Sequence, residues 1–225
     1  MEGQDWRSLA GRLAALGSIA GEAAHRFNNL RSVIDGTLDL VAGAPSGALT
    51  ERRLERVREA AARAQALAAG LAALGRSRAG ADVSLDLADW LRAARPWLRQ
   101  LLAPATELSL VAPDQPVTLR ADPNALRAAM TALVLNAATA VGPAGRISIR
   151  LAPTPGAALL SVADDGPGMP PEVAARAREP FFTTRPPAAG LGLTVAESFA
   201  NHRGGRLELS SEPGRGTTVF VHLIP

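Results

Sequence analysis

Two segments in the second half of the chain place a carboxylate or an amide where it could bind a ligand. Asp164 begins the sequence Asp-Asp-Gly-Pro-Gly, directly after an apolar stretch that predicts a strand. A carboxylate at a strand end can accept a hydrogen bond from an exocyclic amine, and Gly166 and Gly168 let the backbone approach a flat ligand closely. Asn136 lies in an apolar run of a predicted helix, where its amide costs free energy unless it is used, and its oxygen suits Mg²⁺. An ordinary Asp-Gly turn and a structural asparagine are the alternatives for each segment alone.

A glycine pair and an aromatic pair follow further along the chain. Gly190 and Gly192, on either side of Leu191, open a predicted helix. Glycines at a helix N-terminus expose backbone N–H groups to phosphate, and the helix dipole favours the negative charge. Just before them, residues 179–185 read Glu-Pro-Phe-Phe-Thr-Thr-Arg, so the two aromatics can anchor a mobile segment and leave Arg185 to reach a terminal phosphate. A core plug followed by a loop is the alternative.

A histidine in the first predicted helix could act as a nucleophile. His25 and Asn29 are four residues apart, so they share one helical face. An imidazole nitrogen can attack phosphorus. By itself, a helical histidine is more often a surface residue, and His202 and His222 are expected to be structural or exposed because neither lies in a motif.

The hydrophobic periodicity predicts the elements that would position these residues. We expect helices at 6–41, 50–74, 86–102, 122–141 and 191–202, and strands at 108–111, 117–120, 147–151, 158–162, 206–210 and 217–223. A Gly/Pro/Ser-rich stretch at 43–47 separates the first two helices, Thr50 is expected to cap the second, and residues 75–80 are expected to form a hinge.

This order of elements predicts an α+β fold in two domains. Residues 1–79 form an antiparallel helical hairpin, which cannot bury both of its faces and is expected to pair with a second copy into a four-helix bundle. Residues 80–225 mix helices with a mostly antiparallel sheet, which predicts an α/β sandwich.

The segments of the second domain resemble, in order and spacing, the asparagine, glycine and phenylalanine boxes of the GHKL (Bergerat-type) ATPases. A closing Gly-Arg-Gly-Thr-Thr at 214–218 is similar to the last glycine box of the histidine-kinase branch. The resemblance implies that Asp164 contacts the adenine amine of ATP and that Asn136 ligates Mg²⁺. It also implies that Gly166, Gly168 and the Gly190–Gly192 pair let the backbone close on the nucleotide.

Residues 24–30, Ala-His-Arg-Phe-Asn-Asn-Leu, resemble the histidine box of nitrogen-regulator-type sensor kinases, whose usual form is His-Glu-Phe-Asn-Asn-Leu. The resemblance implies that His25 is phosphorylated from ATP and passes the phosphoryl group to an aspartate on a response-regulator receiver domain. Asn29 would help orient the water that hydrolyses phospho-aspartate. Three departures stand out: Arg26 replaces an acid, Ala132 replaces a second asparagine, and the lid, 186–189, is short.

Three functions are therefore compatible with the sequence. The first is a dimeric histidine kinase that receives its signal from a separate sensor protein, because 225 residues leave no room for a sensor domain beside the two predicted domains. The second is a histidine phosphotransferase that relays phosphate between response regulators with weak or no autokinase activity, which Arg26 favours. The third is a scaffold that uses nucleotide only to fix its shape.

Composition constrains the partners. The pI is about 11.0 although the net charge is only +3, because the chain has no lysine and its cations are arginines of very high pKa. These arginines are interspersed with acids along predicted helices, so no nucleic-acid partner is expected. The absence of cysteine fits a reducing cytoplasm, and neither a signal peptide nor an 18-residue apolar segment is expected, so no membrane insertion is expected.

Overall fold

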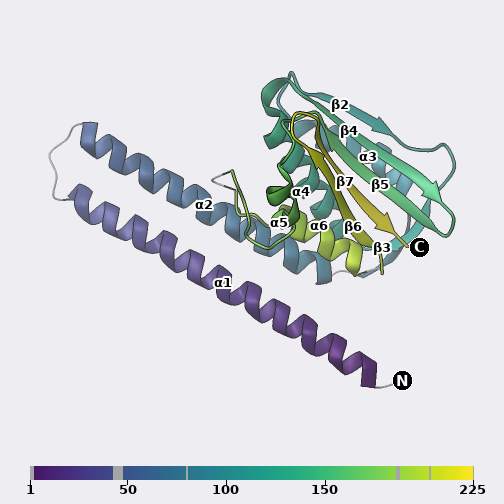
Figure 1. The fold of residues 1–225 in the computed structure, drawn as a ribbon, viewed down its shortest axis with the longest axis horizontal. Coiled ribbons are helices and arrows are strands. Elements are labelled where there is room, and N and C mark those ends of the chain that lie inside the picture. Colours follow the sequence, from purple (N-terminus) through teal and green to yellow (C-terminus); the bar gives the residue numbers. More distant parts are fainter. Residues whose placement is uncertain (1–2, 43–47, 80, 186–187, 203, 225) are drawn as a thin grey trace. The chain divides into compact units, whose positions relative to one another are not determined.

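A computed structural model describes residues 3–42, 48–79, 81–185, 188–202 and 204–224. The chain forms two compact units. Figure 1 shows its helices and strands, coloured along the sequence. Unit 1 comprises Met1–Ala69 and Thr183–Ala189, and unit 2 comprises Gly70–Phe182 and Gly190–Pro225. The predicted fold class is confirmed: a helical N-terminal part precedes a domain of helices packed on a sheet.

Two long helices, α1 (Gly3–Ala42) and α2 (Ala48–Ala79), begin the chain. Helix α2 begins before Thr50, the predicted cap, and it continues through Gly75 into the predicted hinge. A glycine in a helix costs only about 1 kcal/mol relative to alanine, and the leucines, alanines and arginines around Gly75 favour the helix. The predicted break at 43–47 and Gly80 of the hinge lie outside the described residues. The domain boundary at 79/80 stays a prediction.

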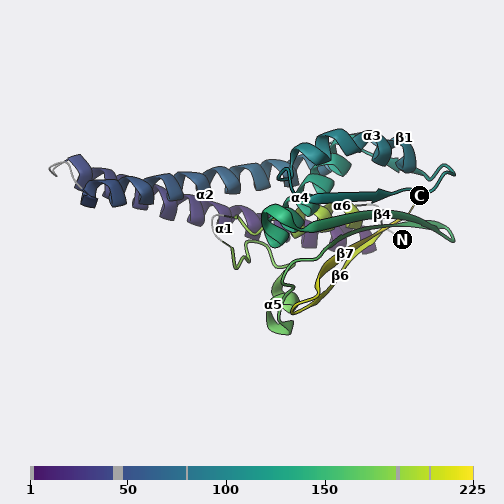
Figure 2. The ribbon, with the colours of Figure 1, turned by 90° about the horizontal axis from the view of Figure 1, so that it is seen from above.

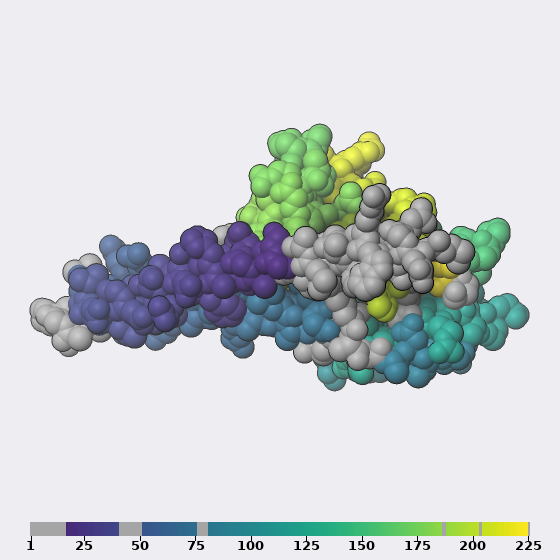
Figure 3. Space-filling view, turned by 90° about the horizontal axis from the view of Figure 1, so that it is seen from below, coloured from purple at the N-terminus to yellow at the C-terminus, as the bar shows by residue number. Residues whose placement is uncertain are grey.

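Unit 1 buries Leu67 and several small side chains and leaves other large apolar side chains exposed. Ala23 and Thr37 of α1 and Ala60 of α2 are buried, and Arg53 donates a hydrogen bond from Nη1 to the Leu40 carbonyl oxygen at 2.8 Å. In Figure 3 the described part of α1 is an exposed purple surface. Among the described side chains of the two helices, the exposed large hydrophobics are Phe27, Val33, Leu38, Leu40 and Leu54.

Unit 2 is built on a five-stranded sheet of order β2-β4-β5-β7-β6. Only the β2–β4 pair is parallel among the described strands of this sheet, as expected for a mostly antiparallel arrangement. Its strands are β2 (Glu107–Val111), β4 (Arg146–Thr154), β5 (Ala157–Asp164), β6 (Arg206–Glu212) and β7 (Gly216–Leu223). A separate antiparallel pair joins β1 (Val83–Asp86) to β3 (Thr118–Ala121).

Three helices cover one face of this sheet (Figure 2). They are α3 (Leu87–Gln100), α4 (Pro123–Val141) and α6 (Gly192–Asn201). Alternate residues of the strands, such as Ile149 of β4 and Leu160 of β5, point into the core, which also buries Phe199 of α6. The short α5 (Pro171–Arg176) packs beside β6 and a 3₁₀ turn, η1 (Gly142–Ala144), follows α4.

The predicted helices and strands of unit 2 are found within a few residues of their expected limits. Besides the three-residue 3₁₀ turn η1, two elements were not predicted. Strand β1 has only four residues and lies next to the predicted hinge, and α5 has only six residues, too few to show a helical period.

Helix α4 with its 3₁₀ turn, Pro123–Ala144, is the one segment of the described residues that is long and apolar enough to cross a bilayer. This composition differs from the sequence expectation that no such stretch exists. Its apolar side chains Leu126, Met130 and Val134 are fully buried in the core of unit 2, which accounts for the composition.

Asp86 ties the start of α3 to the strand pair beside it. Its Oδ1 accepts hydrogen bonds from the N–H groups of Ala88 at 2.9 Å and Val117 at 3.1 Å, and the Leu87 N–H donates to the Val117 carbonyl at 2.9 Å. The Val117 N–H is the main cause of a lowered pKa of the Asp86 carboxyl. Asp86 is therefore both a helix N-cap and a clamp on β3.

We expect Asp86→Ala to lower the free energy of unfolding by about 1 to 2 kcal/mol. The variant loses both the N-cap hydrogen bond of α3 and the acceptor of the Val117 N–H. The measurement is urea unfolding followed by the fluorescence of Trp90 and Trp97, which lie in α3. Since the folded pKa is lowered, the charge contributes fully above the ordinary aspartate pKa and is lost as the pH falls through the lowered value.

The control is Asp114→Ala, which removes an exposed carboxylate between β2 and β3. An equal loss of stability in both variants, or an Asp86→Ala penalty that does not shrink as the pH falls through the lowered pKa of Asp86, would contradict this role.

Candidate functional site

The amide of Asn136 lies against the N-terminus of α6. A Cβ atom placed on Gly192 would come within 2.7 Å of Asn136 Nδ2 and 2.8 Å of Oδ1. Residue 192 therefore has to be glycine if the amide is to keep this position. The contact joins the asparagine predicted to bind metal to the glycine predicted to admit phosphate.

One turn further along α4, Ala140 lies beside the segment that follows β5. A Cβ atom on Gly166 would be 3.0 Å from Ala140 Cβ and 2.8 Å from Asp164 Oδ1, and that oxygen accepts the Gly166 N–H at 3.0 Å. Because Asn136 and Ala140 are four residues apart, they share one face of α4 and are separated by about 6 Å along the helix axis. This face of α4 therefore connects the Asp164 carboxylate to the start of α6.

Gly168 packs against the β6–β7 turn, backbone to backbone. It has φ 66°, and a Cβ atom there would meet the Glu212 carbonyl oxygen at 1.9 Å. Gly216 has φ 82°, and a Cβ atom there would lie 1.9 Å from the Asp164 carbonyl oxygen. Glycine is needed at these two positions because the backbone on either side of Asp164 packs directly against other backbone. The sequence alone does not indicate this requirement.

The first turn of α6 is not capped by any side chain of the described residues. Its N-cap position is the buried Leu191, whereas Asp86 and Asp122 cap α3 and α4. The first N–H groups of a helix have no partner within the helix, and the helix dipole makes this end electropositive. The end of α6 beside Asn136 therefore suits an anionic group of a ligand.

Phe181 and Gly190 close the base of the segment that carries Arg185. The Phe181 N–H donates to the Gly190 carbonyl at 2.8 Å, and a Cβ atom on Gly190 would strike the Phe181 backbone at 2.5 Å. Phe181 is buried and has φ 65°, the one non-glycine residue of the described chain with a positive φ. Such strain persists only where the surroundings enforce it.

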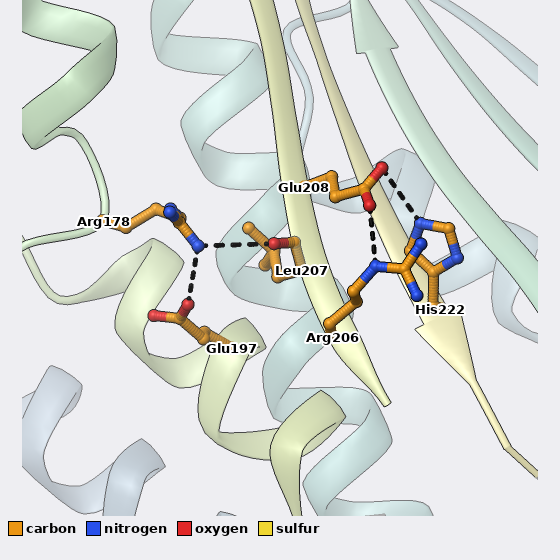
Figure 4. Close-up of polar contacts among 6 residues, drawn as sticks. All are labelled: Arg178, Glu197, Arg206, Leu207, Glu208 and His222. Carbon is orange, nitrogen blue, oxygen red and sulfur yellow. Dashed lines mark hydrogen bonds and ion pairs between the residues drawn. The ribbon is translucent and has the colours of Figure 1, made fainter. Parts of the chain in front are cut away.

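Arg178, three residues before Phe181, binds a helix and a strand of the same unit (Figure 4). Its Nη1 lies 3.1 Å from Glu197 Oε1 of α6 and 3.5 Å from the Leu207 carbonyl oxygen of β6. The Arg176 guanidinium lies over the Phe182 ring at 4.2 Å. The residues just before the predicted lid are thus fixed to a helix and a strand.

Asp165 differs from its neighbour Asp164. It accepts the backbone N–H of Arg146 at 2.7 Å and lies 3.1 Å from that side chain's Nε, and these hydrogen bonds keep the pKa of Asp165 below its ordinary value. Both aspartates border a hollow of about 320 Å³. The Asp164 Oδ1 lies beside Gly166 and Ala140, whereas the Asp165 Oδ1 lies beside Gly145 and Val141.

His222 of β7 takes part in an ion cluster with β6. Glu208 lies between His222 Nε2 at 3.2 Å and Arg206 Nε at 2.7 Å (Figure 4), and Arg206 is the main cause of the lowered pKa of Glu208. This agrees with the structural role expected for His222. His202, at the end of α6, is exposed.

The histidine predicted to accept phosphate is exposed in α1. Asn29 Nδ2 lies 3.3 Å from His25 Nε2, so the pairing expected from their spacing is present. Arg26 is bound to a carboxylate, because its Nε lies 2.8 Å from Glu22 Oε1.

Unit 2 brings together seven of the predicted site residues: Asn136, Asp164, Gly166, Gly168, Gly190, Leu191 and Gly192. Unit 1 contains the other three: His25, Asn29 and Arg185. The Arg185 carbonyl accepts the Ala188 N–H at 3.0 Å, whereas residues 186–187 of the expected lid lie outside the described residues. Their roles with a ligand stay predictions.

Sequence reasoning missed Ala140, the Arg178 clamp and Glu22. Ala140 is detectable as the position one turn after Asn136, and Glu22 is the only acid between Asp5 and Asp35. Nothing in the sequence marks Arg178 or the positive φ of Phe181.

Residues 121–225 match the family "Histidine kinase-, DNA gyrase B-, and HSP90-like ATPase". The C4-dicarboxylate transport sensor protein DctB of Pseudomonas aeruginosa is 30% identical over 234 residues, which cover 100% of this chain and 38% of that protein. The chain thus spans less than half the length of this relative.

Solved structures agree with the fold. The mycobacterial sensor histidine kinase MprB matches with a TM-score of 0.56 and 27% identity, covering 64% of this chain and 97% of that chain. The histidine kinase ThkA, in complex with the response regulator protein TrrA, matches with a TM-score of 0.73 and 19% identity over 98% of this chain and 65% of that chain. Residues 121–225 therefore form an ATPase domain of the family that histidine kinases share with DNA gyrase B and HSP90, and the chain is similar over its whole length to sensor kinases.

Proposed function

We propose that this protein is a histidine kinase that phosphorylates His25 from Mg·ATP and passes the phosphoryl group to an aspartate of a response regulator. The observation that carries the proposal is the contact of Asn136 with Gly192 at the uncapped start of α6. An amide oxygen and unpaired backbone N–H groups are the donor set that a magnesium-bound triphosphate requires.

The side of α4 that carries Asn136 and Ala140 has one end suited to the adenine of ATP and the other suited to its phosphates. Asp164, beside Gly166 and Ala140, offers a carboxylate to the adenine amine, and the start of α6 offers N–H groups to the phosphates. Mg²⁺, held through Asn136, would neutralise charge that develops on the phosphates. Arg185 extends from the segment that Phe181 and Gly190 close, where a guanidinium can pair with the terminal phosphate.

His25 is suited to be the acceptor because it is exposed and its Nε2 has an amide neighbour. Attack by an imidazole nitrogen on the γ-phosphorus forms the N–P bond and releases ADP. The ThkA complex with a response regulator supports a receiver domain as the next acceptor.

The hairpin would act as a homodimer. Phe27, Leu38 and Leu54 are each at least 36% exposed in the single chain, and a second copy would bury such side chains in a four-helix bundle. We further propose that the stimulus comes from a sensor protein and that the kinase works in the cytoplasm, where a chain without cysteine loses nothing to reducing conditions.

The first test is phosphoryl transfer from radiolabelled Mg·ATP to the purified protein. We expect acid-labile, base-stable label on the wild type, none on His25→Ala, and unchanged label on His202→Ala, whose histidine is also exposed. Label on His25→Ala would contradict the assignment. Label that arrives only from a phosphorylated regulator would instead show a phosphotransferase.

The second test compares two neighbouring carboxylates by calorimetry with ATP and Mg²⁺. Asp164→Asn should weaken ATP binding by about 100-fold or more. The variant loses the carboxylate charge, and in one orientation its amide N–H faces the adenine amine, so that two donors oppose each other. Asp165→Asn should bind within about threefold of the wild type, because Asp165 is engaged with Arg146. Equal losses in the two variants would refute the role of Asp164. The hairpin dimer, measured by sedimentation, should survive both changes.

The third test separates two reasons for glycine. Gly192→Ala should weaken ATP binding by about tenfold or more with the fold intact, because the new methyl group displaces only the flexible Asn136 amide. Gly168→Ala should instead lower the free energy of unfolding by more than about 1 kcal/mol, because it meets a backbone oxygen at positive φ. Gly36→Ala, in open space on α1, is the control for both measurements. Unimpaired binding by Gly192→Ala would contradict the proposed site.

A further inference from the structure

Four side chains of α1 form one polar face around His25. Glu22, His25, Arg26 and Asn29 occur at spacings of three, four and seven residues, so they follow one another along the same side of the helix. All lie in the described, solvent-facing part of α1. Arg26, beside the histidine in sequence, is engaged with Glu22 one turn earlier.

The contact with Asn29 fits one of the two tautomers of the neutral His25 ring. The Asn29 Nδ2 group is a donor, so His25 Nε2, 3.3 Å away, accepts from it. The neutral imidazole then carries its hydrogen on Nδ1. Nε2 keeps the lone pair and is the nitrogen able to attack phosphorus, once the amide gives way.

Formation of the N–P bond leaves a charge to be balanced. The Nε2 lone pair bonds to the γ-phosphorus, the bond from that phosphorus to the bridging oxygen breaks, and its electron pair leaves with ADP. The ring is then a cation with a proton on Nδ1, and neutral phosphohistidine forms only when that proton departs. A carboxylate at Nδ1 stabilises the cation and can accept the proton.

Glu22 is the carboxylate that α1 offers. It is the only acid between Asp5 and Asp35, and it precedes His25 by three residues, a spacing that places two Cβ atoms about 5 to 6 Å apart. Arg26 Nε lies 2.8 Å from Glu22 Oε1, which leaves Oε2 to accept a further hydrogen bond. The pair is exposed, at 46% for Glu22 and 41% for Arg26, so its attraction is weak enough for the carboxylate to turn toward the ring.

We propose that Glu22 is the positioning residue of His25: it accepts the Nδ1–H, holds the tautomer that exposes the Nε2 lone pair, and takes up the proton as phosphohistidine forms. Arg26 keeps Glu22 on this face of the helix. The acid that other kinases of this type place directly after the histidine is thus supplied from the preceding turn. This inference rests on the proposed function for its kinetic part, and its structural part stands without it.

The test uses the full chain and two readouts. Glu22→Gln should slow the initial labelling of His25 at saturating Mg·ATP by about tenfold or more, with the KM for ATP unchanged. Adding Arg26→Glu to Glu22→Gln, which moves the acid to the other neighbouring position, should restore most of the rate. The matched control is Asp35→Asn, because Asp35 also lies four residues from an arginine, Arg31, on α1.

The second readout needs no nucleotide. In ¹⁵N spectra of the neutral imidazole, the wild type and Asp35→Asn should show the Nδ1–H form, and Glu22→Gln should shift His25 toward the Nε2–H form. Wild-type labelling rates in Glu22→Gln, or a slow variant with an unchanged tautomer and no rescue by Arg26→Glu, would overturn the proposal. If the wild type took no label, the proposed function would fail. The spectra would then still show whether Glu22 accepts the Nδ1–H of His25.

Discussion

Helix α6 can place its N-terminus against Asn136 only because residue 192 has no side chain. A single methyl group there would occupy the position of the amide. The approach extends through the packing of the two helices, since Ala129 and Ala137 of α4 and Ala196 and Ala200 of α6 are all buried. Small residues let helix axes lie close together, so the positive end of α6 lies beside the amide that is predicted to bind metal.

Glycine is required at the other end of the site as well, because backbone packs directly on backbone there. Gly168 lies against the Glu212 carbonyl, and Gly216 lies against that of Asp164. No side chain could adapt to these contacts, so the position of the Asp164 carboxylate follows from the register of β5 with β7. Nearby, Phe181 has a positive φ, and Arg178, three residues before it, is bound to α6 and β6.

The sequence predicted most of this fold because its signals are local. Asp122 before Pro123 marked the start of α4, and the alternation of Ile147, Ile149 and Leu151 marked β4 as a half-buried strand. The end of α2 was misjudged because Gly75 looks like a breaker, whereas an exposed helix tolerates one glycine at a cost that its neighbours cover.

For the site, the sequence indicated which residues carry the chemistry but not why the glycines are needed. Gly168 and Gly192 looked alike as flexible positions near a ligand. The structure separates them, because one faces a backbone oxygen and the other an amide side chain. That distinction depends on contacts between residues more than 40 positions apart, which no local pattern records. Glu22 is not marked by the histidine-box pattern, because it lies one turn before His25 and that pattern places its acid directly after the histidine.

The two units differ in how firmly they hold their functional groups, and the proposed reaction explains the difference. A nucleotide gains reactivity when rigid groups fix its phosphates, so glycine contacts and buried helices suit unit 2. The acceptor histidine has to meet two partners in turn, first the nucleotide and then a receiver aspartate. Its contact with the Asn29 amide at 3.3 Å is weak and can be exchanged, and the Glu22–Arg26 pair on the same face of α1 is exposed. A buried, fully bonded imidazole would keep its tautomer equally well but could not be reached by either partner.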